Sequence, residues 1–417
     1  MTMKYSRSII IGLIAVFISS CSSSVTDSER PTVPVRELNA VEQQLVDADR
    51  SFSHELFRNI VVEDDKENVF ISPLSVSFAL GMALNGAEGE TFNDMRETLG
   101  FSSLNLEEIN DGYESLMTLL NGIDPDVVMN IANSAWLKEN ALNINQAYVD
   151  RIETHFDAEL SELNFNNPEA AEIINNWVNQ KTNGKIEKLF DGSIPSDIVF
   201  LLINALVFEA DWTNQFDPEL TEKASFHLEN GDSAQVDMME REAVYASLFN
   251  EDVKMLNIPY GDSLFTMTVL MPADGSTPME QFIQESVNQQ NIKVWSDKLS
   301  DQRIILQLPR FELEYEIKLN KILKMMGMPK AFDPQQANFA GMLAESIGIN
   351  QGLFINQVKH KAFVKVDEEG TEAAAVTSVG FGADSTSPAM IFDRPFVFII
   401  RERTSGANLF MGMVKNP

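Results

Sequence analysis

Few residues of this 417-residue chain stand at spacings that catalysis or metal binding requires. The four histidines, His54, His155, His227 and His360, form no His-x-x-x-His pair and do not stand beside paired carboxylates at ligand spacing. The single cysteine, Cys21, rules out a disulfide within the sequence and a Cys-based metal cluster. No Gly-x-Ser-x-Gly elbow, Walker loop or complete dinucleotide fingerprint occurs. We therefore predict that the protein is not an enzyme and has neither a metal site nor a cofactor.

The most unusual segment is EEGTEAAAVTSVGFGADSTSPA, from Glu368 to Ala389. It joins two strand-like runs, Phe363 to Val366 and Phe396 to Ile400, and contains no Lys, no Arg and one bulky residue, Phe381. Structureless connections longer than about 12–15 residues are usually functional or disordered. The small and β-branched residues of this one are typical of a buried strand, yet no partner strand stands beside it in sequence.

This segment has the alternation that a strand needs to enter the middle of a sheet. One face would carry small and then apolar side chains, Thr371, Ala373, Ala375, Thr377, Val379 and Phe381, while Glu372 falls on the other face. No proline interrupts the run from Gly370 to Ser387, and Gly370 permits unusual dihedral angles where the backbone turns into the sheet. About ten new ladder hydrogen bonds would contribute on the order of 10 kcal/mol, comparable to the stability of a whole domain.

Composition and charge limit the classes of partner. The protein is 44% hydrophobic with a mean hydropathy of −0.11, which is typical of a globular protein with a large core. Its formal net charge of −31 repels phosphate backbones and anionic headgroups, so we exclude nucleic acid as a partner. The simplest role of this charge is to keep the protein soluble and, we expect, monomeric.

The N-terminus is typical of an export signal. Cations precede an apolar run, Ile9 to Ile18, which is too short to span a membrane. The stretch FISSC resembles a bacterial lipoprotein cleavage box, which implies a signal peptide over residues 1–21 and a lipid on Cys21; an ordinary secretory signal with an incidental cysteine is the alternative. The polar range 22–44 is expected to be a flexible tether. The protein would then be lipid-anchored in a bacterial cell envelope, at the outer membrane and cell surface or in the periplasm, facing the extracellular space.

Helices dominate the first part of the folded region and strands the second. Apolar spacing predicts helices over Asp49–Val61, Ser75–Leu84, Thr91–Leu99 and Ala170–Thr182. Continuous apolar runs predict strands over Ile198–Phe208, Leu264–Met271, Ile304–Leu308, Phe396–Ile400 and Leu409–Val414. Because no regular βαβ repeat appears, we predict a single α+β domain.

Several stretches together resemble the serpin family. They are NVFISPLSVSFALGMALNGAEGET from Asn68, LLINALVFEADWTNQF from Leu201, HKAFVKVDEEGTEAAA from His360 and FDRPFVFIIRERTSGANLFMGMVKNP at the end. The resemblance implies a serpin domain over residues 45–417, with three β-sheets, eight to nine helices and an exposed reactive-centre loop at about 368–391.

The resemblance also implies a function. A protease would cleave the loop as a substrate and form an acyl-enzyme; the loop would then insert as a new strand and distort the protease before deacylation, a recognised type of conformational switch. We therefore expect a suicide-substrate inhibitor of extracellular serine proteases, with cysteine proteases as a second target class. The alternative is a non-inhibitory binding protein with the same fold. The expected partners are a covalently bound target protease and, through the lipid, a membrane.

The resemblance assigns three groups of residues. We call the first the hinge: Glu368, Gly370, Thr371, Glu372, Ala373, Ala374 and Ala375. The second is the shutter, a buried polar cluster expected to hold the sheet closed, Ser72, Ser75, Asn204 and His360, with Trp212 at the top of the sheet where insertion starts. The third is the reactive bond, Asp384–Ser385, with Ala383 and Phe381 as the alternative residues before the bond. An acidic residue before the bond predicts a protease with a basic pocket; the alternatives predict elastase-, subtilisin- or chymotrypsin-like enzymes.

Overall fold

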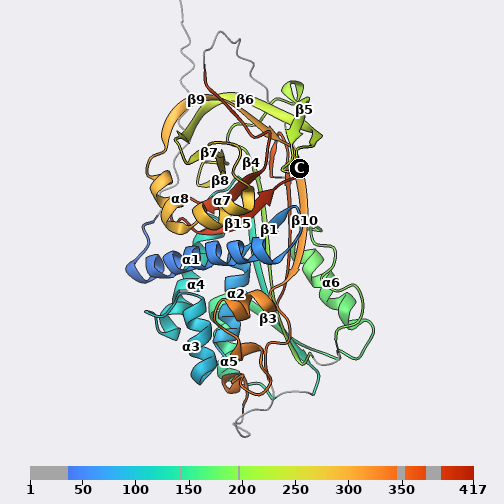
Figure 1. The fold of residues 1–417 in the computed structure, drawn as a ribbon. Coiled ribbons are helices and arrows are strands. Elements are labelled where there is room, and N and C mark those ends of the chain that lie inside the picture. Colours follow the sequence, from blue (N-terminus) through green and yellow to red (C-terminus); the bar gives the residue numbers. More distant parts are fainter. Residues whose placement is uncertain (1–35, 141–142, 196–197, 345–352, 372–386) are drawn as a thin grey trace, which may run out of the picture. The chain divides into compact units, whose positions relative to one another are not determined.

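The computed structural model describes most of the protein after residue 35, namely residues 36–140, 143–195, 198–344, 353–371 and 387–417. Nine α-helices lie in this described part: α1 Ala40–Glu63, α2 Pro73–Leu84, α3 Gly89–Thr98, α4 Leu106–Leu120, α5 Gln146–Phe156, α6 Ala170–Lys181, α7 Met279–Ser286, α8 Gln289–Ser296 and α9 Asn320–Met325. Figure 1 shows α3, α4 and α5 gathered on one side of α1 and the strands β5, β6 and β9 on the other. None of the described helices is long and apolar enough to cross a bilayer.

The longest sheet has nine strands in the order β1-β15-β14-β8-β7-β6-β9-β13, with β5 also paired to β6. Its members are β1 Val69–Ile71, β5 Glu222–His227, β6 Ser233–Phe249, β7 Val253–Tyr260, β8 Phe265–Pro272, β9 Ser300–Pro309, β13 Ala389–Ile391, β14 Phe396–Glu402 and β15 Asn408–Val414. Strands β8, β14 and β15 are buried along nearly their whole length because both faces of this part of the sheet are covered.

Two smaller sheets carry the strands that border the predicted insertion site. One has the order β12-β4-β2-β3, with β12 Gly370–Thr371, β4 Phe200–Asp211, β2 Val127–Lys138 and β3 Ala158–Leu163. The other pairs β10 Phe311–Lys318 with β11 Lys359–Val366. The loop residues Gly370 and Thr371 thus already form a short strand, and β4 and β11 belong to different sheets.

The two faces of β4 are buried against different layers. Leu206 and Phe208 pack into the main core, whereas Leu201 and Ile203 pack into a second apolar cluster with α6. The helix α6 therefore covers the outer face of this strand. Burial on both sides agrees with the near-continuous apolar run from which the strand is predicted.

The predicted α+β class, with three sheets and eight to nine helices, is confirmed by the described elements. The predicted helices and strands are all present, with one large difference in bounds: the first helix begins at Ala40 rather than Asp49. Its start is a capping box in which the Asn39 side chain accepts from the Glu42 backbone, and the Glu42 carboxylate accepts from the Asn39 backbone. The helix therefore extends into the range 22–44 that the sequence predicts as a tether.

Candidate functional site: the hinge and the slot beside β4

The hinge begins inside a sheet rather than above it. Gly370 lies opposite Asp211, and Thr371 lies opposite Ala210, in antiparallel pairing with the end of β4. The backbone N–H of Trp212 donates to Glu369 O at 2.9 Å, and its indole Nε1 donates to Asp367 O at 2.9 Å. The start of the loop is therefore held to the end of β4 by backbone and side-chain hydrogen bonds.

Glu368 is buried in a polar network that fixes the approach to the hinge. Its side chain is only 4% exposed, and its Oε2 accepts from Arg310 Nε at 2.6 Å. Its Oε1 accepts from Thr221 Oγ1 at 2.5 Å, and the backbone N–H of Phe216 donates to Glu368 O at 2.8 Å. The hydrogen bond to Glu368 raises the pKa of Arg310. The pair is charge-assisted and so is a strong anchor for this turn.

Gly370 is required by close packing rather than by an unusual dihedral angle, which corrects the reason that the sequence suggests. It is an extended residue of β12. A Cβ at this position would lie 2.1 Å from Ala210 O and 2.6 Å from the Cα of Asp211. Only a residue without a side chain lets the hinge approach β4 this closely.

Thr371 faces inward, as the predicted alternation requires. It is 4% exposed, and its Oγ1 is 2.7 Å from the hydroxyl of Tyr260. The Tyr260 ring stacks on Trp212 with centroids 4.3 Å apart. Burial raises the pKa of Tyr260, so its hydroxyl stays protonated and can donate to Thr371. Tyr260 thus contacts the first inward-facing residue of the loop, and Trp212 packs against the Tyr260 ring.

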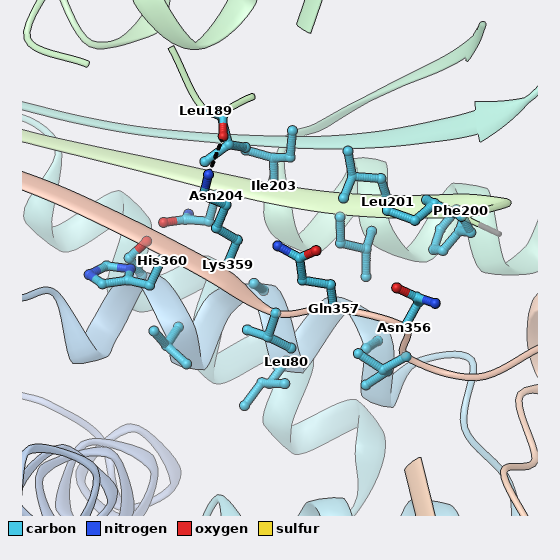
Figure 2. Close-up of a pocket in the computed structure, with 18 of the residues that line it drawn as sticks. Leu80, Leu189, Phe200, Leu201, Ile203, Asn204, Asn356, Gln357, Lys359 and His360 are labelled. Atoms are coloured by element: carbon cyan, nitrogen blue, oxygen red, sulfur yellow. Dashed lines mark hydrogen bonds between the residues drawn. The ribbon is translucent and has the colours of Figure 1, made fainter. Parts of the chain in front are cut away.

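Below the hinge, a cavity of about 100 Å³ separates β4 from β11 (Figure 2). We call it the slot. Its walls come from α2, β4 and the residues leading into β11, and apolar side chains dominate them: Val76, Leu80, Leu201, Ile203, Phe339 and Leu353. The slot thus lies where two strands of different sheets run without pairing to each other, which is where a further strand would find backbone edges to pair with.

Two lysines of β11 tie the strand to the segment that follows α6. Lys359 Nζ donates to Leu189 O at 2.6 Å (Figure 2) and lies 2.8 Å from Glu316 of β10. Lys361 Nζ donates to Lys188 O at 3.2 Å. These bonds bridge one side of the slot, so a strand entering there must pass beneath or displace them.

The predicted shutter is divided between two places. His360 Nε2 accepts from the backbone N–H of Ser72 at 3.0 Å, and Ser72 Oγ accepts from Ser75 N at 3.2 Å as the N-cap of α2. Burial lowers the pKa of His360 to about 4, so its imidazole is neutral at pH 7 and the accepting Nε2 carries no proton. This bond links α2 to β11 across the floor of the slot.

Asn204, the fourth shutter residue, bonds elsewhere. Its Nδ2 donates to Asn133 Oδ1 on β2 at 2.7 Å, and Asn133 Nδ2 donates to Phe156 O at 2.6 Å. Within the described residues, no hydrogen bond joins Asn204 to the other three shutter residues, and its buried Oδ1 has no partner. Asn204 is also one of the residues that line the slot.

The remaining predicted site residues lie outside the described part of the protein. They are the hinge residues Glu372, Ala373, Ala374 and Ala375, the reactive-bond residues Phe381, Ala383, Asp384 and Ser385, and Cys21. Conversely, the structure adds residues that the sequence does not single out: Thr221, Tyr260 and Arg310 at the hinge, and Asn133, Lys359 and Lys361 at the slot. Only Lys359 and Lys361 stand near a predicted motif, as the neighbours of His360.

Comparison with known proteins decides the family. The model of the family described as "Serpin (serine protease inhibitor)" matches residues 47–417. The protein belongs to the serpin family. Serpin B8 of Homo sapiens is 32% identical over 382 residues, which cover 89% of this serpin and 99% of the relative. This membership confirms the prediction that the protein is not an enzyme, because serpins are inhibitors of proteases.

Solved structures agree in fold. The native state of tengpin, a thermophilic serpin, superposes with a TM-score of 0.82 at 32% identity, covering 92% of this serpin and 96% of tengpin. Human thyroxine-binding globulin, solved in complex with its ligand, also gives a TM-score of 0.82, at 28% identity, covering 91% of this serpin and 100% of the globulin. The fold is thus similar both to that of a serpin in its native state and to that of a thyroxine-binding protein.

Proposed function

We propose that this serpin is a suicide-substrate inhibitor of extracellular serine proteases, with cysteine proteases as a second class of target. The observation that carries the proposal is the position of β12. Gly370 and Thr371 pair with the end of β4, and further along the same strand the slot separates β4 from β11, two strands that belong to different sheets.

In this proposal, cleavage lets the segment after Thr371 continue β12 down the slot. The protease's nucleophile attacks the carbonyl before the scissile bond, the new amino terminus leaves, and the acyl-enzyme remains attached to the free end of the loop. About ten ladder hydrogen bonds at roughly 0.5–1.5 kcal/mol each would favour insertion. The unpaired Oδ1 of Asn204 would gain a donor. The protease, still attached to the loop as an acyl-enzyme, would be moved from the hinge end of β4 to the opposite end of that strand before water could hydrolyse the acyl bond.

For the reactive bond we propose Asp384–Ser385, which makes proteases with a basic primary pocket the first candidates. Ala383 or Phe381 would instead direct the inhibitor to elastase-, subtilisin- or chymotrypsin-like enzymes. A panel of such proteases should be incubated with the protein and resolved by denaturing electrophoresis. An SDS-stable adduct of protease plus inhibitor is expected, and mass spectrometry of the released C-terminal fragment identifies the bond. Cleavage without any adduct across the panel would contradict inhibition, and a bond outside Phe381 to Ser385 would contradict the assigned register.

A binding protein without inhibitory activity is the second candidate, favoured by the similarity to thyroxine-binding globulin. The two candidates differ in the fate of the cleaved loop. An inhibitor yields the covalent adduct, whereas a carrier is either left intact or cut without trapping the protease. The permissive hinge, with Thr371 already buried and small residues from Ala373 to Ala375 in the sequence, supports the inhibitor.

We also propose that a lipid on Cys21 anchors the inhibitor in a bacterial envelope, where it would protect surface or periplasmic proteins. The lipobox-like FISSC stretch and the polar residues after it support this proposal. Metabolic labelling with a radioactive fatty acid should mark the protein and should fail for Cys21→Ser. Labelling that persists in this variant, or wild-type protein that carries no label and is soluble, would contradict the anchor.

A further inference from the structure

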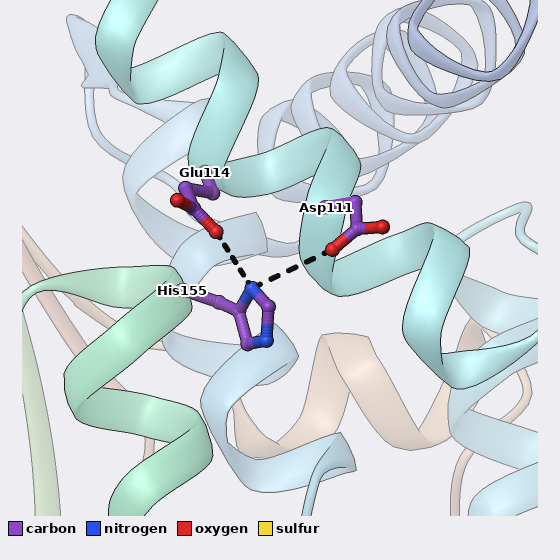
Figure 3. A group of neighbouring side chains, drawn as sticks. All are labelled: Asp111, Glu114 and His155. Carbon is purple, nitrogen blue, oxygen red and sulfur yellow. Dashed lines mark hydrogen bonds and ion pairs between the residues drawn. The ribbon is translucent and has the colours of Figure 1, made fainter.

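A histidine and two carboxylates converge between α4 and α5, away from the hinge and the slot (Figure 3). His155 Nδ1 lies 2.8 Å from Glu114 Oε2 and 3.8 Å from Asp111 Oδ1. The three ligand atoms all lie within 4.8 Å of one another. The two carboxylates come from successive turns of α4, and the imidazole comes from the last turn of α5. The three side chains thus point at one place from two different helices.

The charges at this place are unbalanced. Asp111 and Glu114 are at i and i+3 on one helix face, where like charges repel. Among the residues that the structure describes, His155 is the ion-pair partner of both carboxylates. One imidazole therefore stands between two anions, and it offers at most one positive charge.

We propose that Asp111, Glu114 and His155 form a site for a divalent transition-metal ion of the zinc class. One imidazole nitrogen and two carboxylate oxygens, completed by water, make a usual donor set for Zn²⁺, and Co²⁺ and Ni²⁺ accept the same donors. Ca²⁺ and Mg²⁺ prefer oxygen ligands alone, so they should compete poorly for a site that depends on His155.

The geometry is close to what such an ion needs. Ligand atoms about 2.0–2.2 Å from a tetrahedral zinc stand roughly 3.3 Å apart. The observed 2.8 Å and 3.8 Å separations lie on either side of that value, so small side-chain rotations would complete the site. The imidazole is mostly shielded, with 20% of its side chain exposed, whereas Asp111 is 63% exposed. An ion can therefore enter from solvent on the side of the carboxylates.

The position of the site indicates what a bound ion would do. It would join α4 to α5, and α5 runs directly into the edge strand β3. The residue after His155 is Phe156, whose carbonyl accepts from Asn133 on β2. An ion would therefore stabilise the helices that precede two strands of the four-stranded sheet. We expect the melting temperature of the folded protein to rise when the site is occupied.

A second acidic group, Asp124, Asp126 and Asp262, serves as an internal comparison. It contains carboxylates only, and Asp124 accepts the backbone N–H groups of Asp126 and Asp262 at 3.0 and 2.9 Å. On a protein with a net charge of −31, any cation will bind weakly at many such places. A specific site must therefore be recognised by its dependence on His155.

The test is calorimetric titration of the chelator-treated protein with Zn²⁺ at about 0.15 M salt, where surface charges are well screened. We expect one saturable site per molecule, with affinity lowered at least tenfold by His155→Gln and by Glu114→Gln. The controls His227→Gln, an exposed histidine elsewhere, and Asp262→Asn should bind Zn²⁺ like the wild type. The increase in melting temperature on adding Zn²⁺ should be lost in the His155 variant.

Co²⁺ gives a second readout that does not depend on the stability of a variant. Its visible absorption bands should appear with the wild type and be displaced by one equivalent of Zn²⁺. Equal Zn²⁺ affinity in the wild type and the His155 and Glu114 variants would overturn the proposal, as would the absence of a saturable site in the wild type. Neither result would bear on protease inhibition, because these residues lie outside the hinge and the slot.

Discussion

Replacing Thr371 by arginine should convert the inhibitor into a substrate. Thr371 is the first inward-facing residue of the loop, 4% exposed and 2.7 Å from the Tyr260 hydroxyl. The substitution leaves that buried hydroxyl without its partner, at a cost of about 1–3 kcal/mol. In the intact protein we expect the guanidinium to leave this buried position, so that its return into an apolar space during insertion costs several kcal/mol more when no anion pairs with it.

If about 4 kcal/mol of this cost is added to the activation free energy of insertion, the insertion rate falls roughly 1,000-fold. Deacylation would then occur first, and the protease would be released active. The assay is the number of inhibitor molecules consumed for each protease molecule inactivated, together with electrophoresis of the products. Thr371→Ser, which keeps the hydroxyl, is the matched control and should behave like the wild type. Adduct formation by the arginine variant at the wild-type yield would refute this account of the hinge.

Other predictions concern the contacts around the slot and the hinge. His360→Ala leaves the buried N–H of Ser72 unpaired, which costs about 1–3 kcal/mol and should speed spontaneous loop insertion or polymerisation on mild heating. Native electrophoresis measures the polymers, and residual protease inhibition measures the loss of active inhibitor. A variant that stays monomeric and inhibitory like the wild type would count against the shutter. The pKa of His360 is about 4 in the folded protein and about 6.5 in an unfolded one, so the neutral imidazole contributes to the free energy of unfolding above pH 6.5, and up to roughly 3 kcal/mol of that contribution is lost as the pH falls toward 4. Urea unfolding of the wild type and of His360→Gln, each at about pH 7 and pH 4.5, isolates this contribution. An equal loss of stability in both proteins would be inconsistent with the assignment. Arg310→Ala removes the cation beside buried Glu368 and should lower the free energy of unfolding by on the order of 1–2 kcal/mol. The loss is limited to this size because Arg310 is partly exposed and solvent screens its charge. A urea midpoint equal to that of the wild type would argue against this anchor.

Apolar runs in the sequence predict the core strands well, because those strands are covered on both faces. The same reading misses several strands, among them β2, whose run is broken by Asn130, Asn133 and Ser134. Asn133 and Ser134 are fully buried, and Asn133 is accommodated because it bonds to Phe156 O and to Asn204. A buried polar residue with partners elsewhere in the fold looks, in sequence, like a residue of a loop.

For the site, local patterns predict the residues of the loop but not their surroundings. The alternation from Thr371 onward predicts its inward orientation, and burial of Thr371 agrees with it. Its partner Tyr260 is 111 residues away, and the partner of Glu368, Arg310, is 58 residues away. No spacing rule connects such pairs, because the fold alone brings them together.

Long separation also explains why the sequence predicts no metal site. Glu114 and His155 are 41 residues apart and lie on two helices that meet side by side. Ligand spacing is recognisable in sequence only when one helix or one turn carries most of the ligands. Convergence of this kind becomes visible only when the packing of α4 against α5 is known.

The measurement that tests the central claim most directly compares the thermal unfolding of intact protein with that of protein cleaved once in the reactive loop. If the intact protein is a high-energy form that relaxes by adding a strand between β4 and β11, the cleaved form should melt at a much higher temperature, and Thr371→Arg should abolish most of that increase. Identical melting of the intact and cleaved wild-type protein would contradict the account, because no energy would then be available to disable a bound protease.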